Sequence, residues 1–337
     1  MKKLNFIWLL VKLFVIYIQC NSIKRYKYIN NTNGCITDKN TRNVSYDNNV
    51  KSDFLFDKVK IFCLMITGPQ YIESRVKFQK ETWLSKCNDY LYVSSLSNTS
   101  LPSVAANVIE GRDTLWEKIR FGLQYVYDNY KDKFDWLLLI DDDSFVIMEN
   151  LRFYLLSQNS NDLLHHGFRM KDLKSFNKDG YIQGGGGDVL SKLALEALIT
   201  NGFKNISMCK EGNTDSGDVE LGICLANVNV KIGESRDFLG RLRFVPGTPD
   251  AYTGVEDNSI FNSFNNLGYF KQPRGINSLS EYLISLHYLS GHNMYFIDYL
   301  LYQANVFGRQ TSLFRNIGSS KFNDNFINSE ILSILNC

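Results

Sequence analysis

The sequence lacks an excess of charge of either sign, although it has many charged residues. Its 337 residues include 37 lysines and arginines against 35 aspartates and glutamates, which leaves a net charge of +2. Proteins that bind nucleic acids or acidic membranes mainly through charge carry a much larger basic excess. No nucleic-acid partner is therefore expected, and function must reside in local sites. The length and the 44% hydrophobic content favour one large catalytic domain.

Several recurring patterns are also missing. The chain has no internal repeat, no heptad run and no cysteine spacing typical of zinc sites. Four glycines occur in a row from Gly184 to Gly187, but no Lys-Ser/Thr pair follows them, so they do not form a phosphate loop of the Walker type. We expect these glycines to let the backbone approach a ligand or a neighbouring strand closely.

An uninterrupted apolar run long enough to span a membrane is missing as well. The N-terminal run from Leu4 to Ile18 follows two lysines and contains Lys12, where a charge disfavours membrane insertion. This pattern is typical of targeting to the secretory pathway. Residues 1–20 are interpreted as a short cytosolic tail with a retained signal-anchor, because no small-x-small cleavage pattern precedes Cys20, or alternatively as a cleaved signal peptide. Both interpretations place the remainder of the chain in the lumen.

Acceptor triplets for N-glycosylation agree with a luminal location. Asn-x-Ser/Thr triplets begin at Asn30, Asn43, Asn98 and Asn205.

Cysteine usage agrees with an oxidising compartment. Six of the seven cysteines follow residue 20. We predict that Cys63 bridges Cys87 and that Cys209 bridges Cys224, since each pair closes a short loop. Buried free thiols are the alternative interpretation. No partner is assigned to the remaining two, Cys35 and Cys337.

The composition changes near residue 59. Residues 21–58 are polar and rich in asparagine, and they are predicted to form a luminal stem with little fixed structure. Val59 to Thr67 is a nearly continuous apolar run that ends at Gly68, which indicates a strand buried on both faces. A helical stretch to about Lys86 and a strand around Tyr90 to Ser94 should follow.

Strands and helices continue to alternate further along the chain. A helix is expected from Asp113, because apolar residues recur at helical spacing at Leu115, Ile119, Leu123 and Val126. Residues 136–140 form another wholly apolar strand. This alternation predicts an α/β domain with a mostly parallel central sheet flanked by helices.

Three adjacent carboxylates follow that last strand directly, at Asp141, Asp142 and Asp143. In α/β sheets, ligands bind beyond the carboxyl ends of the strands. Because like charges this close repel each other, a divalent cation such as Mg²⁺ or Mn²⁺ is the economical explanation, and it can bridge to a diphosphate. A solvated acidic turn or a helix N-cap is the structural alternative.

Several spaced motifs together resemble the core 1 β1,3-galactosyltransferase family over residues 59–308. In chain order the motifs are Thr67-Gly68-Pro69-Gln70, Glu110-Gly111-Arg112-Asp113, Asp135-Trp136 through Asp143, Tyr181 to Ser191, Ser235-Arg236-Asp237 and His287-Tyr288. The resemblance implies a GT-A fold and a single-pass type II protein of the Golgi or ER membrane. Residues 309–337 then form a C-terminal tail, and a homodimer is one candidate assembly.

The resemblance also implies an activity and a cofactor. The family consists of inverting enzymes that use Mn²⁺ to transfer galactose from UDP-galactose to the 3-hydroxyl of N-acetylgalactosamine (GalNAc) on serine or threonine of glycoproteins. Asp141, Asp143 and His287 correspond to the metal ligands, and Asp218 corresponds to the general base. Mixed carboxylate and imidazole ligation favours Mn²⁺. For Asp218 alone, a helix N-cap is the alternative role.

The remaining site residues are assigned by the same resemblance. Donor-binding positions correspond to Ile66, Thr67, Glu110, Gly111, Arg112, Lys118, Asp141 and Tyr288. Acceptor contacts are expected from Phe264 and Tyr269, in an aromatic region that is thinner here than in the family. Lys118 could equally be a plain surface base on its helix.

The sequence departs from the family at several positions. Gly217 replaces a glutamate, Leu139 replaces a lysine, and Asp188 replaces a tyrosine; an adjacent cysteine pair is also absent. Three alternatives therefore stay open: a fringe-like transferase that uses UDP-N-acetylglucosamine, a non-catalytic chaperone relative of the core 1 enzyme, and a carbohydrate-binding module. The intact aspartate triplet disfavours the chaperone. A carbohydrate-binding module would leave the triplet and His287 without a common function.

Overall fold

A computed structural model describes residues 48–171, 178–212, 214, 216–254 and 258–304. They belong mainly to one compact unit, Lys51–Arg309. The predicted anchor, stem residues 21–47 and the tail 309–337 lie outside the described residues. Within the described ranges, no helix has the length and apolar character to cross a membrane.

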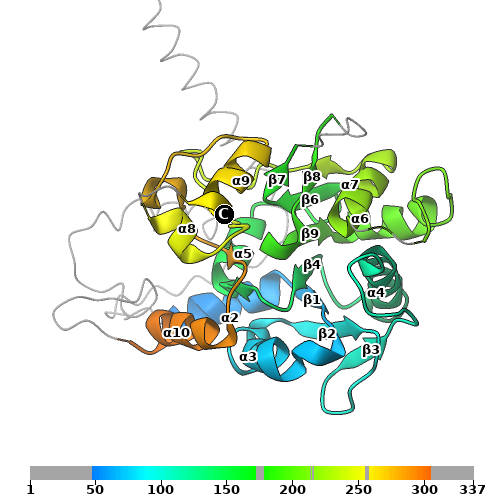
Figure 1. The fold of residues 1–337 in the computed structure, drawn as a ribbon, viewed down its shortest axis with the longest axis horizontal. Helices are drawn as coiled ribbons and strands as arrows, with labels where there is room; N and C mark the ends of the chain where they lie inside the picture. Colours follow the sequence, from blue (N-terminus) through cyan, green and yellow to red (C-terminus); the bar gives the residue numbers. More distant parts are fainter. Residues whose placement is uncertain (1–47, 172–177, 213, 215, 255–257, 305–337) are drawn as a thin grey trace, which may run out of the picture. The chain divides into compact units, whose positions relative to one another are not determined.

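A seven-stranded sheet forms the centre of the fold (Figure 1). Its spatial order is β10-β6-β9-β4-β1-β2-β3. All adjacent pairs are parallel except those of β9, which runs antiparallel to both β4 and β6. The strands span Ile61–Ile66 (β1), Asp89–Ser94 (β2), Ser103–Ala105 (β3), Trp136–Asp141 (β4), Leu164–Gly167 (β6), Asp188–Ser191 (β9) and Lys231–Ile232 (β10). The predicted mostly parallel α/β sheet is confirmed.

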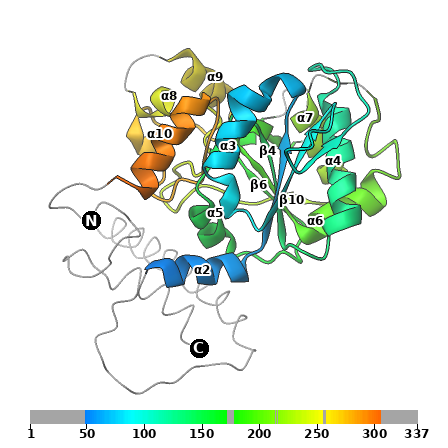
Figure 2. The same cartoon turned by 90° about the horizontal axis from the view of Figure 1, so that it is seen from below.

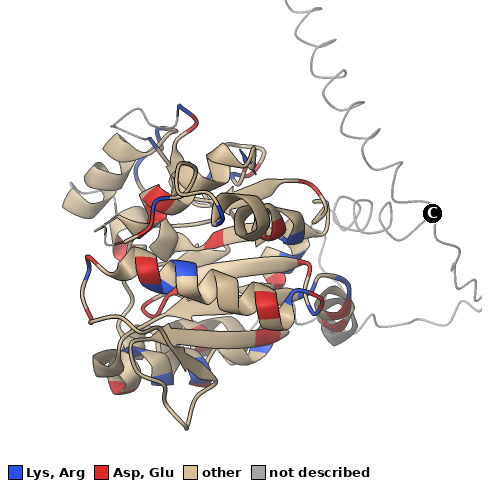
Figure 3. Ribbon diagram, turned by 90° about the vertical axis from the view of Figure 1, so that its right-hand side faces the viewer, with Lys and Arg blue, Asp and Glu red and all other residues tan. Residues whose placement is uncertain are grey.

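Helices cover both faces of the sheet. Figure 2 shows α4, α6 and α7 on one face, and α3, α5 and α10 on the other. The helices span Asn48–Lys58 (α2), Lys77–Glu81 (α3), Leu115–Tyr130 (α4), Met148–Leu155 (α5), Lys192–Ala197 (α6), Gly217–Asn227 (α7), Pro249–Thr253 (α8), Ser259–Leu267 (α9) and Gly291–Tyr302 (α10). Basic and acidic residues are interspersed over the ribbon in the view of Figure 3.

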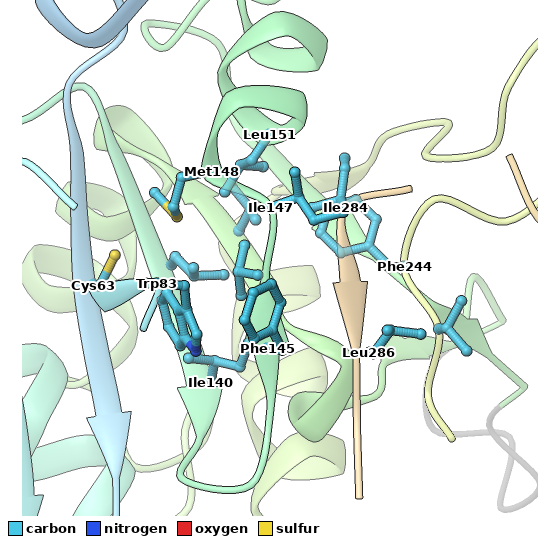
Figure 4. Packing of buried hydrophobic residues seen from close by; sticks show 14 of the residues in the cluster. Cys63, Trp83, Ile140, Phe145, Ile147, Met148, Leu151, Phe244, Ile284 and Leu286 are labelled. Atoms are coloured by element: carbon cyan, nitrogen blue, oxygen red, sulfur yellow. The ribbon is translucent and has the colours of Figure 1, made fainter. Parts of the chain in front are cut away.

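Strand β1 explains why both faces need covering. Every residue from Ile61 to Ile66 is buried, as the continuous apolar run predicts. Successive side chains of a strand point to opposite faces, so Cys63 and Met65 join one core cluster while Leu64 and Ile66 join the other. Figure 4 shows the first cluster, in which Trp83 and Ile140 pack near side chains of α5 and of the chain around residue 285.

Two short ribbons complete the framework. β5 (Phe145–Val146) pairs antiparallel with β11 (Ser285–Leu286), and β7 (Arg169–Met170) pairs antiparallel with β8 (Tyr181–Ile182). The first ribbon joins the chain just after the aspartate triplet to the chain just before His287.

Both predicted disulfides are confirmed. Cys63 is bonded to Cys87, and Cys209 is bonded to Cys224. Two of the predicted glycosylation acceptors, Asn98 and Asn205, lie in turns outside the strands and helices, whereas Asn30 and Asn43 fall outside the described residues.

The end of the predicted stem differs from expectation, because Asn48–Lys58 is helical. Phe56 of this helix lies under the guanidinium of Arg152, whose central carbon is 4.7 Å from the ring centre. The backbone carbonyl of Phe56 also accepts a hydrogen bond of 2.9 Å from the side-chain amide of Asn88. These contacts come from distant parts of the chain, so local sequence pattern did not predict this helix.

Candidate functional site

A cavity of about 480 Å³ opens at the carboxyl ends of β1 and β4. It is lined by residues from β1, β4, α4, α7, the glycine run and the segment after β11. All eleven residues expected to bind donor or metal or to act as the base line it: Ile66, Thr67, Glu110, Gly111, Arg112, Lys118, Asp141, Asp143, Asp218, His287 and Tyr288. Their individual roles stay predictions, but the structure brings them together.

Asp141, Asp143 and His287 form a compact group of metal-ligating side chains. One ligand atom from each lies within 4.8 Å of the others. Nε2 of His287 is 3.2 Å from Oδ1 of Asp143 and 3.7 Å from Oδ2 of Asp141. The three side chains can therefore share one divalent cation.

The ring of His287 is oriented for ligation. Its Nδ1 lies 3.1 Å from the carbonyl oxygen of Pro246, and because a carbonyl can only accept, Nδ1 carries the proton. Nε2 then presents its lone pair to the two aspartates, as in metal sites where a second partner fixes the imidazole tautomer. The ring is 3% exposed and stacks on Tyr288 at 3.8 Å between ring centres. Tyr288 has a positive φ of 56°.

The electrostatics of this group favour a cation. Displacement of solvent is the main cause that raises the pKa of Asp141 to about 6; His287 opposes this rise and the neighbouring aspartates contribute to it. Burial alone would lower the pKa of His287, but Asp143 and Asp141 raise it, so the site favours a positive charge there. Oδ1 of Asp143 is buried without a hydrogen-bond partner. Such an orphaned oxygen fits a metal ligand.

Asp142 plays a different part, since both of its oxygens already have partners. Thr67 donates its hydroxyl at 2.6 Å, and Arg75 donates at 2.8 Å. Arg75 also lies 3.3 Å from Asp143 and lines the cavity. The sequence analysis missed Arg75, because it belongs to no singled-out motif and reaches the site only through the fold.

Two buried side chains hold the turn that carries the triplet. Gln79 donates from its amide to the carbonyl oxygens of Asp141 and Ser144, at 2.9 and 3.1 Å. Trp83 donates from its indole to the same Ser144 carbonyl at 3.0 Å. The helical stretch after β1 therefore fixes the aspartates in place.

Lys118 and Glu110 form an ion pair in the cavity wall. Nζ of Lys118 donates to Oε2 of Glu110 at 2.9 Å and to the carbonyl of Thr67 at 3.0 Å. Burial alone would raise the pKa of Glu110, but hydrogen bonds from Lys118 and Ser95 outweigh that effect and lower it. Lys118 is thus a buried positioning group and not a plain surface base. Arg112 is exposed, and the described residues offer its guanidinium no partner.

The glycine run lets the backbone approach His287, as expected. A Cβ atom placed on Gly185 would collide with the imidazole ring. The carbonyl of Gly185 also accepts a hydrogen bond of 2.7 Å from the hydroxyl of Ser144, next to the triplet.

Gly185→Ala is expected to weaken Mn²⁺ binding about 10- to 100-fold, because the ring of His287 must leave its hydrogen bond to Pro246. Calorimetric titration with Mn²⁺ measures the change. Gly184→Ala is the matched control, since a Cβ there meets its nearest neighbour, Asp218, at an ordinary 3.7 Å. Equal affinities in the two variants would contradict the tight packing of Gly185 against a ligand.

Asp218 lies in the first turn of α7 and faces the cavity. Ser216 and not Asp218 occupies the N-cap position, but its side chain makes no capping bond; Oδ1 of Asp218, inside the helix, accepts a hydrogen bond of 2.9 Å from the N–H of Val219. Burial raises the pKa of Asp218, against the effect of backbone hydrogen bonds. A carboxylate with a raised pKa is a better proton acceptor near neutral pH. Gly217 brings this turn against α4, because a Cβ there would lie 2.8 Å from Ile119.

The expected acceptor residues lie outside this cavity. Phe264 is 6.4 Å from the ring of Tyr288, measured between ring centres. Tyr269 stacks instead under the guanidinium of Arg169, at 3.6 Å. The other two departures from the family lie side by side in the sheet, because Leu139 of β4 pairs with Asp188 of β9. Both line the cavity.

Comparisons with known proteins agree with this geometry. A family model described as Fringe-like matches residues 56–246. Glycoprotein-N-acetylgalactosamine 3-beta-galactosyltransferase 1 of Xenopus laevis is 33% identical over 266 residues, covering 78% of this chain and 72% of the relative. Beta-1,3-glucosyltransferase of Mus musculus is 26% identical, covering 53% of this chain and 35% of the relative.

Among solved structures, the catalytic domain of Drosophila β1,4-galactosyltransferase 7 in complex with xylobiose overlaps 52% of this chain and 63% of its own. The TM-score is 0.30 at 14% identity, so this overlap supports no conclusion about fold or function. The family model and the Xenopus relative cover enough of the chain to establish its family. This chain is a β1,3-glycosyltransferase that belongs to the core 1 β1,3-galactosyltransferase family, within the Fringe-like group.

Proposed function

We propose that this protein is an inverting, Mn²⁺-dependent enzyme that transfers galactose from UDP-galactose to the 3-hydroxyl of GalNAc on serine or threonine of glycoproteins. One observation carries the proposal: two carboxylates and an orientated imidazole lie together in one cavity with the expected donor-binding residues and Asp218. The proposed acceptor, GalNAc on a glycoprotein, follows the name of the Xenopus relative. The GT-A description of the fold is part of the same proposal.

On the donor side, this chain's residues bind and orient the sugar nucleotide. Asp141, Asp143 and His287 would hold the cation, which when bound stabilises negative charge on the departing diphosphate. The guanidinium of Arg112, which has no partner among the described residues, would bind phosphate at the cavity wall. Lys118 keeps Glu110 fixed, so that Glu110 can face the nucleotide with a defined geometry.

On the acceptor side, Asp218 takes the proton. An inverting transfer needs one base that removes the proton of the attacking hydroxyl as the sugar is transferred. Asp218 lines the same cavity as the metal ligands, and its raised pKa suits that role. The ring of Phe264 lies next to Tyr288, which lines the cavity, and Phe264 would contact the acceptor on that side. Tyr269 belongs to the same aromatic region.

The proposed setting is the lumen of the Golgi or ER. Residues 1–20 would anchor the chain as a single-pass type II protein, and residues 21–47 would connect the anchor to the catalytic unit. The bonded cysteines agree with an oxidising compartment. A homodimer is the proposed assembly.

A different donor sugar is the second candidate. Leu139 and Asp188, which replace the family's lysine and tyrosine, are both among the residues that line the cavity. A glucosyltransferase is also among the relatives. UDP-glucose and UDP-N-acetylglucosamine therefore compete with UDP-galactose as donors.

A donor panel tests the proposal. Purified full-length protein is incubated with a GalNAc-serine peptide and each of the three UDP-sugars, with Mn²⁺ and with a chelator. We expect transfer from UDP-galactose only in the presence of Mn²⁺, measured as a hexose mass increment on the peptide. Transfer from another donor would support the second candidate, and no transfer from any donor would favour a non-catalytic relative.

A further inference from the structure

A second pocket, of about 150 Å³, lies beyond the carboxyl ends of β6 and β10 and outside the catalytic cavity. We call it the arginine pocket. The charged residues of its lining are Arg169, Arg236, Arg243 and Glu234; Ser235 and Gln272 add neutral polar groups, and Phe270 is among the apolar lining residues. Three guanidinium groups against one carboxylate give this lining a net positive charge.

The three arginines differ in how well their charge is balanced. Arg236 makes a two-point ion pair with Glu234, at 2.9 and 2.7 Å, and Arg169 lies 3.5 Å from the carboxylate of Asp179. Arg243 donates to the carbonyl of Arg236 at 2.6 Å. Among the described residues, no carboxylate lies within ion-pair distance of Arg243. Asp237 and Glu234 act on Arg243 only from beyond ion-pair distance, so its guanidinium is the one of the three without a direct carboxylate partner among the described residues.

Gln272 supplies an unpartnered acceptor in the same pocket. The residue is only 8% exposed, and its side-chain oxygen Oε1 is buried without a hydrogen-bond donor. Its backbone is fixed, because N–H and carbonyl both bond to the side chain of Asn265, at 2.7 and 3.2 Å. A buried acceptor held rigidly without a partner costs free energy unless a ligand donates to it.

The size and position of the pocket limit the ligand. A protein cavity of about 150 Å³ can hold a molecule of the size of benzene, so an acidic side chain fits, as does the carboxylate end of an acidic sugar. β6 lies two strands from β4 and runs parallel to it, which places the pocket at the same sheet edge as the aspartate triplet. At about 4.8 Å per strand the separation is roughly 10 Å, or about three residues of extended peptide.

We propose that the arginine pocket binds a carboxylate of the acceptor substrate, about three residues from the serine or threonine that carries GalNAc. Arg243 pairs with the carboxylate, and Gln272 accepts a hydrogen bond from an adjacent N–H or hydroxyl group. The inference rests on the proposed transfer to glycoproteins and adds a preference among acceptors. The carboxylate comes from an aspartate or glutamate of the polypeptide, or from an acidic sugar attached to it.

The test compares three GalNAc-serine peptides with full-length enzyme, Mn²⁺ and the preferred donor. The first peptide has asparagine three residues from the modified serine, the second has aspartate there, and the third carries glucuronic acid at that position. We expect at least one acidic peptide to show about tenfold higher kcat/KM than the neutral peptide, with most of the change in KM. Arg243→Gln should remove that difference and leave the neutral peptide unchanged.

Lys271→Gln is the matched control. It removes one positive charge beside the pocket, but Lys271 bonds to the carbonyl of Asn265 and does not line the pocket. This variant should keep the acidic preference, and Gln272→Leu should reduce it. Equal rates for all three peptides, or a preference that survives Arg243→Gln, would overturn the proposal. Absence of transfer to every peptide would instead refute the transferase function on which it rests.

Discussion

His287→Ala is expected to lower Mn²⁺-dependent turnover of the sugar nucleotide about 10²- to 10³-fold while the protein stays folded. The imidazole is the one member of the Asp141, Asp143 and His287 group that comes from a distant part of the chain. Its loss leaves the diphosphate to depart beside three aspartates without adequate neutralisation. A loss of several kcal/mol in barrier stabilisation corresponds to a rate about 10²- to 10³-fold lower. Asp143→Ala should have the same effect.

Calorimetric titration of Mn²⁺, and of UDP with and without Mn²⁺, measures the binding part of this prediction. His292→Ala is the control, because His292 is exposed on α10 and does not line the catalytic cavity. Circular dichroism establishes that each variant is folded. If His287→Ala binds Mn²⁺ with UDP and turns over like the parent protein, the three-residue metal site is wrong.

Asp218→Asn is expected to lower kcat by about 10²- to 10⁴-fold while Mn²⁺-dependent UDP binding stays intact. Asparagine keeps the size of the side chain in the first turn of α7 but cannot take a proton from the acceptor hydroxyl. The loss should therefore fall on kcat and not on donor affinity. Steady-state kinetics with the preferred donor, together with titration of UDP, separates the two quantities.

Glu220→Gln provides the control for Asp218. The substitution removes a negative charge from the same first turn of α7, and Glu220 does not line the cavity. It therefore reports any general effect of charge near the helix N-terminus. An Asp218→Asn enzyme with normal kcat would identify a different group as the base.

The sequence predicted the central fold because the signals for it are local. A strand buried on both faces must be apolar throughout, as residues 61–66 are. The amphipathic stripe of α4 was likewise readable from helical spacing, and Ile119, Leu123 and Val126 are buried. The helix α2 was missed because its stabilising contacts come from Asn88 and Arg152.

Some residues of the candidate site were likewise predictable from local sequence, whereas others were not. The aspartate triplet stood out by its charge and its position after a strand, and the resemblance to a family added His287. Arg75 was missed because only packing brings it to Asp142 and Asp143. Lys118 had an ambiguous role until its bonds to Thr67 and Glu110 were known. Local pattern identifies residue types suited to chemistry, whereas long-range contacts decide which of them meet.

The ribbon of β5 and β11 has a consequence for biosynthesis. Val146 pairs with Ser285, 139 positions later in the chain. At a synthesis rate of about 5–20 residues per second, roughly 7 to 28 seconds separate the two strands at the ribosome. During that interval the nascent chain carries the aspartate triplet without His287. A cation held by all three side chains therefore cannot assist early folding, because Asp141, Asp143 and His287 come together only after β11 has been made and pairs with β5.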